Sequence, residues 1–124
     1  MSITVKLDEG LHRVWVTVLP EPQTSTVAET VLRLTRQRPV LGRWDWVIDT
    51  RNPHAQATPE EIDSIAATFN AVRSKQSYTI FVSTDPATYD RCALMARKFL
   101  DRRHLVARSL GEAISLLPQN MHSI

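Results

Sequence analysis

The chain has 124 residues, the length of one domain, and its 43% hydrophobic and 23% charged residues are typical of a soluble globular protein. No apolar stretch approaches the ~18–20 residues of a membrane-spanning helix, and the first residues lack the layout of a signal peptide, so we expect a cytoplasmic protein without an integral membrane segment. A formal net charge of only +2 and three isolated glycines argue against a strongly basic nucleic-acid surface and a glycine-rich phosphate loop.

The N-terminal residues predict a hairpin. Ile3, Val5 and Leu7 alternate with polar residues, which is the period of a half-buried strand. A turn over residues 8–10 precedes a second strand over residues 11–18, so the two strands should pair in antiparallel fashion. Residues 20–22, which contain two prolines, should then form an extended linker.

Three helix starts are marked by a Ser or Thr that stands three residues before a Glu, the spacing of a capping box. The pairs are Thr26 and Glu29, Thr58 and Glu61, and Ser109 and Glu112. The first pair precedes apolar residues at helical spacing, which predict a helix over residues 27–37. The second pair is followed by a long amphipathic run, and the third predicts a closing helix over residues 112–117.

Strands alternate with these helices along the chain. Apolar runs predict strands over residues 44–50, 78–83 and 104–108, and a third helix should begin at residues 85–86, between the last two strands. This order is typical of an α/β layer fold, so we expect a single domain over residues 1–124 with a mixed five-stranded sheet and about four helices. The first strand should be antiparallel and the rest mainly parallel, with residues 118–124 as a loose tail.

The third helix should bury an apolar face that includes Tyr89, Cys92, Ala96, Phe99 and Leu100. A thiol on such a face is typical of an inert core cysteine, and the only cysteine of the chain cannot form an internal disulfide. The region around this helix is also basic, with Arg91, Arg97, Lys98, Arg102, Arg103 and Arg108. Acidic residues interrupt this run, so we interpret it as a solvated helix surface and expect no nucleic-acid partner.

Candidate site residues follow the third and fourth strands, because ligands of open α/β sheets usually bind beyond the carboxyl ends of the strands. Asp49, Thr50, Arg51 and His54 follow the third strand, and Thr84 follows the fourth. An Asp, an Arg and a His on adjacent loops could form an acid–base or anion-binding group, although Asp49 is also a natural turn former. These residues and Thr58 are the candidates for binding a ligand or a partner.

No metal site, cofactor or catalytic residue is predicted. The histidines, His12, His54, His104 and His122, are too dispersed for a metal spacing, and no nucleophile elbow occurs. The tryptophans Trp15, Trp44 and Trp46 are each large enough to bury on the order of 200 Å² in a core. Alternatively, one of them could form the floor of an apolar ligand pocket beneath a gap between helices.

Three stretches of the chain show a family resemblance. They are the strand ending Trp46-Val47-Ile48-Asp49-Thr50-Arg51, the helix pattern of Tyr89, Ala96, Arg97 and Phe99, and the final strand and helix over residues 106–117. Together with the element order, they resemble the STAS domain family, and more specifically its SpoIIAA-like branch of small stand-alone bacterial proteins. The resemblance covers nearly the whole chain.

The resemblance implies a regulatory role without catalysis. In the anti-sigma antagonists of this family, a Ser at the start of the second helix is phosphorylated within an Asp-Ser-Ser/Thr-Gly motif. Thr58 occupies the matching position in Ala57-Thr58-Pro59-Glu60, where the acid and the glycine of the motif are absent. The resemblance therefore makes Thr58 the phosphorylation candidate.

Three functions are consistent with the sequence. The first is a non-enzymatic regulatory or interaction module that contacts a protein partner through residues 49–62, with a homodimer also compatible. The second is a protein that binds or senses a small apolar ligand or lipid, because folds related to the STAS family include lipid-binding proteins. The third is a small enzyme that uses Asp49, Arg51 and His54, which the absence of a paired nucleophile and base disfavours.

Overall fold

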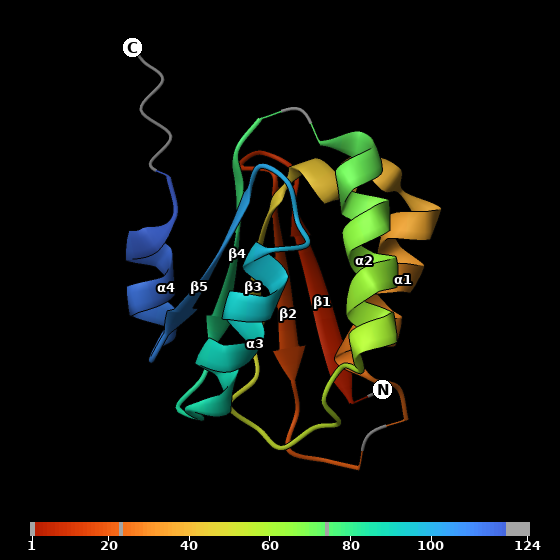
Figure 1. The fold of residues 1–124 in the computed structure, drawn as a ribbon. Helices are drawn as coiled ribbons and strands as arrows, with labels where there is room; N and C mark the ends of the chain where they lie inside the picture. The colour runs from red at the N-terminus through yellow and green to blue at the C-terminus, as the bar shows by residue number, and fades with distance from the viewer. Residues whose placement is uncertain (1, 23, 74, 119–124) are drawn as a thin grey trace.

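A computed structural model describes residues 2–22, 24–73 and 75–118, which form one mixed sheet and four α-helices (Figure 1). The strands are β1 (Ile3–Asp8), β2 (Arg13–Val18), β3 (Asp45–Asp49), β4 (Ser77–Val82) and β5 (Arg102–Ala107). The helices are α1 (Val27–Gln37), α2 (Pro59–Val72), α3 (Ala87–Ala96) and α4 (Leu110–Leu116), with a 3₁₀ helix, η1 (Pro39–Arg43), before β3. None of the helices in these residues is long and apolar enough to cross a membrane.

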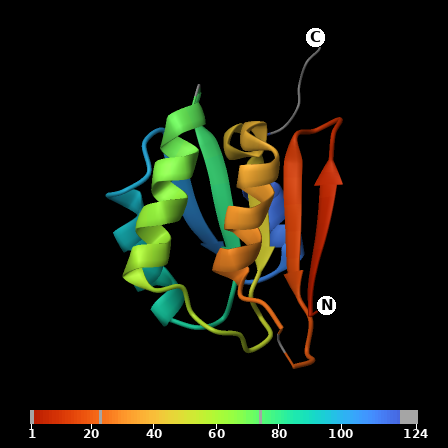
Figure 2. The same ribbon diagram turned by 90° about the vertical axis from the view of Figure 1, so that its right-hand side faces the viewer.

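The five strands lie in sequence order, β1-β2-β3-β4-β5. β1 pairs antiparallel with β2 and forms one margin of the sheet, while β2 to β5 are parallel (Figure 2). The parallel connections contain helices, as a parallel pair requires. The predicted α/β fold, with its antiparallel first strand, is therefore confirmed.

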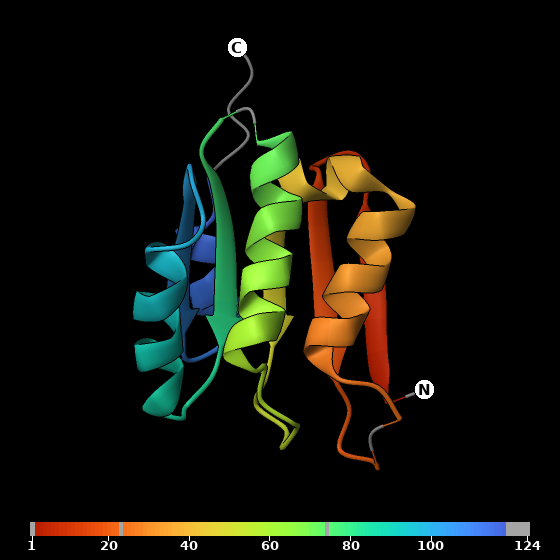
Figure 3. The ribbon, with the colours of Figure 1, turned by 45° about the vertical axis from the view of Figure 1, so that its right-hand side comes forward.

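The sheet separates two apolar cores of unequal size. Trp46 and Ile48 of β3 belong to the larger core beneath α1, α2 and α3, whereas Val47 between them belongs to the smaller core with Ala113 of α4 and the neighbouring Leu117. Successive side chains of a strand point to opposite faces. Three helices thus cover one face and α4 covers the other (Figure 3).

Two of the three predicted capping boxes are complete. Thr26 accepts a hydrogen bond from Glu29 N and Thr58 accepts one from Glu61 N, and each Glu carboxylate accepts in return from the cap residue's N–H. At α4, Ser109 accepts from Glu112 N at 3.1 Å, but the Glu112 carboxylate accepts from Arg108 N instead. Because Ser109 is the N-cap, α4 begins at Leu110, two residues before the predicted start.

Other sequence predictions need correction. Tyr89 is 56% exposed and Ala96 and Leu100 are also exposed, so the buried face of α3 is narrower than the apolar pattern indicated. β5 begins at Arg102 instead of His104. The Pro118 carbonyl accepts a hydrogen bond from the Arg13 guanidinium at 3.0 Å, and the remainder of the predicted tail, with His122, lies outside the described residues.

Arg102 is buried in the core, although its charge suggested a solvated helix surface. It is 7% exposed and points toward the three-helix face of the sheet. Its Nη1 donates to Tyr78 O and Thr79 Oγ1, both at 2.8 Å, and its Nη2 donates to Gly42 O at 3.1 Å and Trp44 O at 2.6 Å. Burial lowers the pKa of Arg102 to about 10, so the group stays charged at neutral pH.

Replacing Arg102 by Met should lower the free energy of unfolding by about 3–5 kcal/mol, because three buried carbonyls would lose a donor and each orphaned acceptor costs roughly 1–3 kcal/mol. Arg103→Met is the matched control, since Arg103 is the exposed neighbour on the same strand. Urea denaturation of both variants tests this. A loss below about 1 kcal/mol for Arg102→Met would show that the guanidinium does not hold these elements together.

Candidate ligand-binding cavity

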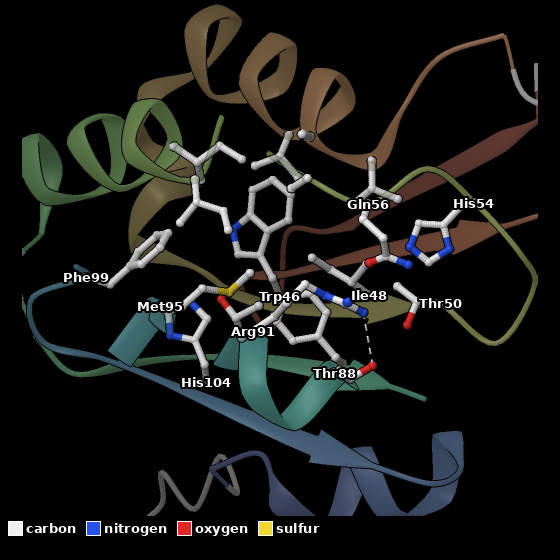
Figure 4. Close-up of a pocket in the computed structure, with 18 of the residues that line it drawn as sticks. Trp46, Ile48, Thr50, His54, Gln56, Thr88, Arg91, Met95, Phe99 and His104 are labelled. Atoms are coloured by element: carbon white, nitrogen blue, oxygen red, sulfur yellow. Dashed lines mark hydrogen bonds between the residues drawn. The ribbon is translucent and has the colours of Figure 1, made fainter. Parts of the chain in front are cut away.

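A cavity lies between the sheet and the three helices that cover its larger core (Figure 4). The cavity has a volume of about 80 Å³. A single water needs roughly 10–15 Å³, so the cavity holds several water-sized groups. α2 packs against α1, and α3 packs against β5, so the cavity occupies the space beneath and between these pairs.

The cavity walls are mainly apolar. Each layer contributes, with Val27, Ala28 and Val31 from α1, Ile62, Ile65 and Phe69 from α2, Met95 from α3, and Trp46, Ile48 and Phe81 from the sheet. Nε1 of Trp46 donates to Leu41 O at 2.8 Å. The Trp46 ring is packed in the larger core and also lines the cavity, so the predicted core role holds and the ring adjoins the pocket as well.

A polar mouth adjoins the cavity at the carboxyl edge of β3 and β4. It is a second depression, lined by residues 50–54 and by Gln56, Ser83, Asp85, Thr88 and Arg91. Five residues line both spaces: Thr50, His54, Gln56, Thr88 and Arg91. Figure 4 shows Thr50, His54 and Gln56 at one end of the cavity and Phe99, Met95 and His104 at the other. The cavity thus has one polar end and one mainly apolar end.

Asp49 and Arg51 satisfy each other. The Asp49 side chain accepts from Arg51 Nε at 2.9 Å and from Nη2 at 2.7 Å, and it also accepts from the Arg51 N–H. These bonds hold the pKa of Asp49 below its ordinary value. Asp49 is 6% exposed and lines neither the cavity nor the mouth, whereas Arg51 lines the mouth. The charges of the two side chains therefore cancel, and their hydrogen bonds hold the start of the loop to the end of β3.

Thr50 and His54 lie where cavity and mouth meet. The Thr50 hydroxyl and N–H both donate to Val82 O, which fixes the end of β3 against β4. His54 Nδ1 lies 3.0 Å from Asn52 O, and because a carbonyl only accepts, Nδ1 carries the hydrogen of this bond. Nε2 of His54 remains for a ligand or for water.

Two sequence candidates lie apart from this site. Thr58 caps α2 and lines neither space, and its Oγ1 accepts from Glu61 N at 3.1 Å. Thr84 is exposed and also lines neither space. The structure thus brings together Thr50, Arg51 and His54 and separates Thr58 and Thr84 from them.

Arg91 is the principal site residue that the sequence interpretation missed. It is half-buried, and its Nη2 donates to Thr88 Oγ1 at 3.3 Å, while Thr88 and Ser83 share a hydrogen bond of 2.7 Å. Positions 88, 91 and 95 all line the cavity and follow the i, i+3, i+7 spacing of one helix face. That spacing was a usable signal, but the charge of Arg91 placed it with the solvated basic residues.

His104 lies at the apolar end of the cavity. Its ring centroid is 4.5 Å from that of Phe99 and 6.4 Å from that of Phe81. Its Nδ1 is buried without a hydrogen-bond partner. Burial, with a smaller contribution from the charge of Arg102, lowers the pKa of His104 to about 3, so the ring is neutral at physiological pH.

The remaining chemistry of the described residues is limited. Among them, no group of three His, Cys, Asp or Glu side chains is placed to hold a metal ion. Burial raises the pKa of Cys92 to about 11, which disfavours the reactive thiolate.

The pH dependence of stability should report His104. His104 takes up a proton below about pH 6.5 in the unfolded chain but only near pH 3 in the folded protein. The free energy of unfolding that depends on neutral His104 is therefore fully present above pH 6.5 and decreases as the pH falls below that value. The wild type should lose about 2–3 kcal/mol through this residue between pH 7 and about pH 4.5. His104→Phe should lose that much less in urea titrations at the two pH values, and equal losses would contradict the prediction.

No protein-family model, curated protein or solved structure matches the chain. The resemblance to STAS domains therefore stays a prediction.

Proposed function

We propose that this protein binds a small, largely apolar molecule in the cavity beneath α1, α2 and α3. The observation that carries the proposal is the cavity itself, an apolar space in the larger of the two cores that opens beside polar side chains at the carboxyl edge of the sheet. Such a concave apolar site with a few convergent polar groups is the usual form of a small-molecule site. Its polar mouth lies at the carboxyl edge of β3 and β4, the edge at which ligands of open α/β folds usually bind.

Binding without catalysis accounts best for the polar groups of the site. Asp49 is neutralised by Arg51, so it is poorly suited to act as a general base. His54 directs Nδ1 to a backbone carbonyl rather than to a carboxylate that would support acid–base chemistry. Burial lowers the pKa of His104 to about 3, so its ring is too weak a base to take up a proton near neutral pH. These groups can orient a ligand, and none forms a nucleophile–base pair.

Regulation through a protein partner stays a prediction of the sequence. Tyr89 of α3 and Leu100 after it are exposed apolar side chains and candidates for such a contact. A ligand in the cavity would touch α1, α2, α3 and the 54–57 loop together. A binding protein of this form could therefore also sense its ligand.

The neutral amphipath octan-1-ol should bind saturably in this cavity. In an NMR titration, the amide chemical shifts of the residues of α1, α2 and α3 that line the cavity should change. Ala28→Leu should weaken binding about tenfold or more, because the larger side chain fills part of the cavity and each displaced methylene group gives up roughly 0.8 kcal/mol. Thermal unfolding should show that the variant remains folded.

Ala67→Leu is the matched control. Ala67 is an exposed residue of α2 outside the cavity, so this variant should bind octan-1-ol as the wild type does. Shifts spread over the surface without saturation, or equal affinities of the Ala28→Leu variant and the wild type, would contradict the proposal.

A further inference from the structure

We infer that the ligand carries a carboxylate, which the guanidinium of Arg91 binds at the junction of the cavity and its mouth, while the apolar part of the ligand fills the cavity. This inference rests on the proposed function, because it concerns the chemistry of the same site. It assigns the ligand to the class of apolar monocarboxylates.

The first observation is the position of Arg91. It lines both the apolar cavity and the polar mouth, and Figure 4 shows its side chain between the two ends of the cavity. Its hydrogen bond to Thr88 Oγ1 orients the side chain within α3. A ligand that enters through the mouth with its apolar part inward would place its polar head beside this guanidinium.

The second observation is the charge around Arg91. Among the described residues, no carboxylate forms an ion pair with it. Arg51, the other arginine of the mouth, is neutralised by Asp49. Asp85 lines the mouth but not the cavity, and its Oδ1 accepts from Ala87 N at 3.0 Å. Within the described part of the chain, a half-buried cation that has a hydroxyl but no carboxylate as its partner thus stands at the entrance to an apolar space, where screening by water is reduced.

The third observation concerns how much negative charge the polar groups at the junction can bind. A guanidinium has five N–H donors in a planar fork, which suits the two oxygens of a carboxylate. Gln56 also lines both spaces and can donate from its amide. Arg91 can neutralise a single negative charge, whereas a phosphate would bring more negative charge to a mouth that Asp85 also lines. A carboxylate fits this arrangement better.

Arg91→Met tests the assignment, with octanoate and octan-1-ol as probes of equal chain length at about pH 7, where the carboxylate is ionised. The variant should bind octanoate about tenfold or more weakly than the wild type, because a charge-assisted hydrogen bond is lost. Octan-1-ol binding should change less than about threefold, since Met keeps the apolar stem. Arg97→Met, at the exposed C-cap of α3 and outside the cavity, should change neither affinity.

The outcomes separate the two proposals. If octan-1-ol binds in the cavity but octanoate does not, or if Arg91→Met leaves octanoate binding unchanged, the carboxylate assignment is wrong and the apolar site stands. If neither probe binds the wild type, both proposals are wrong. Octyl phosphate is the third probe, and tighter binding of octyl phosphate than of octanoate would also overturn the carboxylate assignment. Circular dichroism of the variants checks that each comparison is made between folded proteins.

Discussion

The hydrogen bonds of the buried Arg102 guanidinium hold together the end of the sheet that lies opposite the polar mouth. A cation can stay in a core only when acceptors surround it, and here η1, β4 and the residue before β3 supply them. The same guanidinium lies 4.8 Å from the centroid of Phe69, a wall of the cavity. Gly42 must be small, because an added Cβ would lie 2.6 Å from Val72 Cγ2. Arg102 thus joins η1 to β4 beneath the Phe69 ring of α2.

The cavity follows from how the three helices divide over one face of the sheet. α1 and α2 pack together over one part, while α3 packs on β5 at the opposite margin. Phe99 joins the two groups at the inner end through its edge-to-face contact with Phe69, whose centroid is 5.6 Å away. At the carboxyl edge of the strands, the 54–57 loop and Arg91 line the space instead. One end is therefore packed with aromatic rings, and the other is bordered by polar groups.

The fold was predictable because its signals are local. The capping residues of α1 and α2 bond to atoms three residues away, and strand alternation needs no knowledge of the partner strand. Of the candidate site, the sequence indicated the carboxyl edge of β3 and β4, where Thr50, Arg51 and His54 line the mouth. Arg102 and Arg103 are adjacent and chemically identical, yet one is buried and the other exposed. Whether a charged side chain meets backbone acceptors from η1 and β4 depends on tertiary contacts, so the sequence did not distinguish Arg102 and His104, and only the helical spacing with Thr88 and Met95 pointed to Arg91.

The polar groups around the cavity differ in whether the protein already satisfies them, and this difference separates architecture from recognition. Arg102, the Asp49–Arg51 pair and the Trp46 indole direct their donors to acceptors within the chain. Arg91 and His54 each make one such bond and keep further polar atoms at the junction with the mouth. Because an unsatisfied polar group beside an apolar space costs free energy until it finds a partner, a ligand gains most where such groups remain. Under the proposed function, the remaining polar atoms at the junction would meet the polar end of the ligand, while the unpartnered Nδ1 of His104 lies at the opposite end of the cavity.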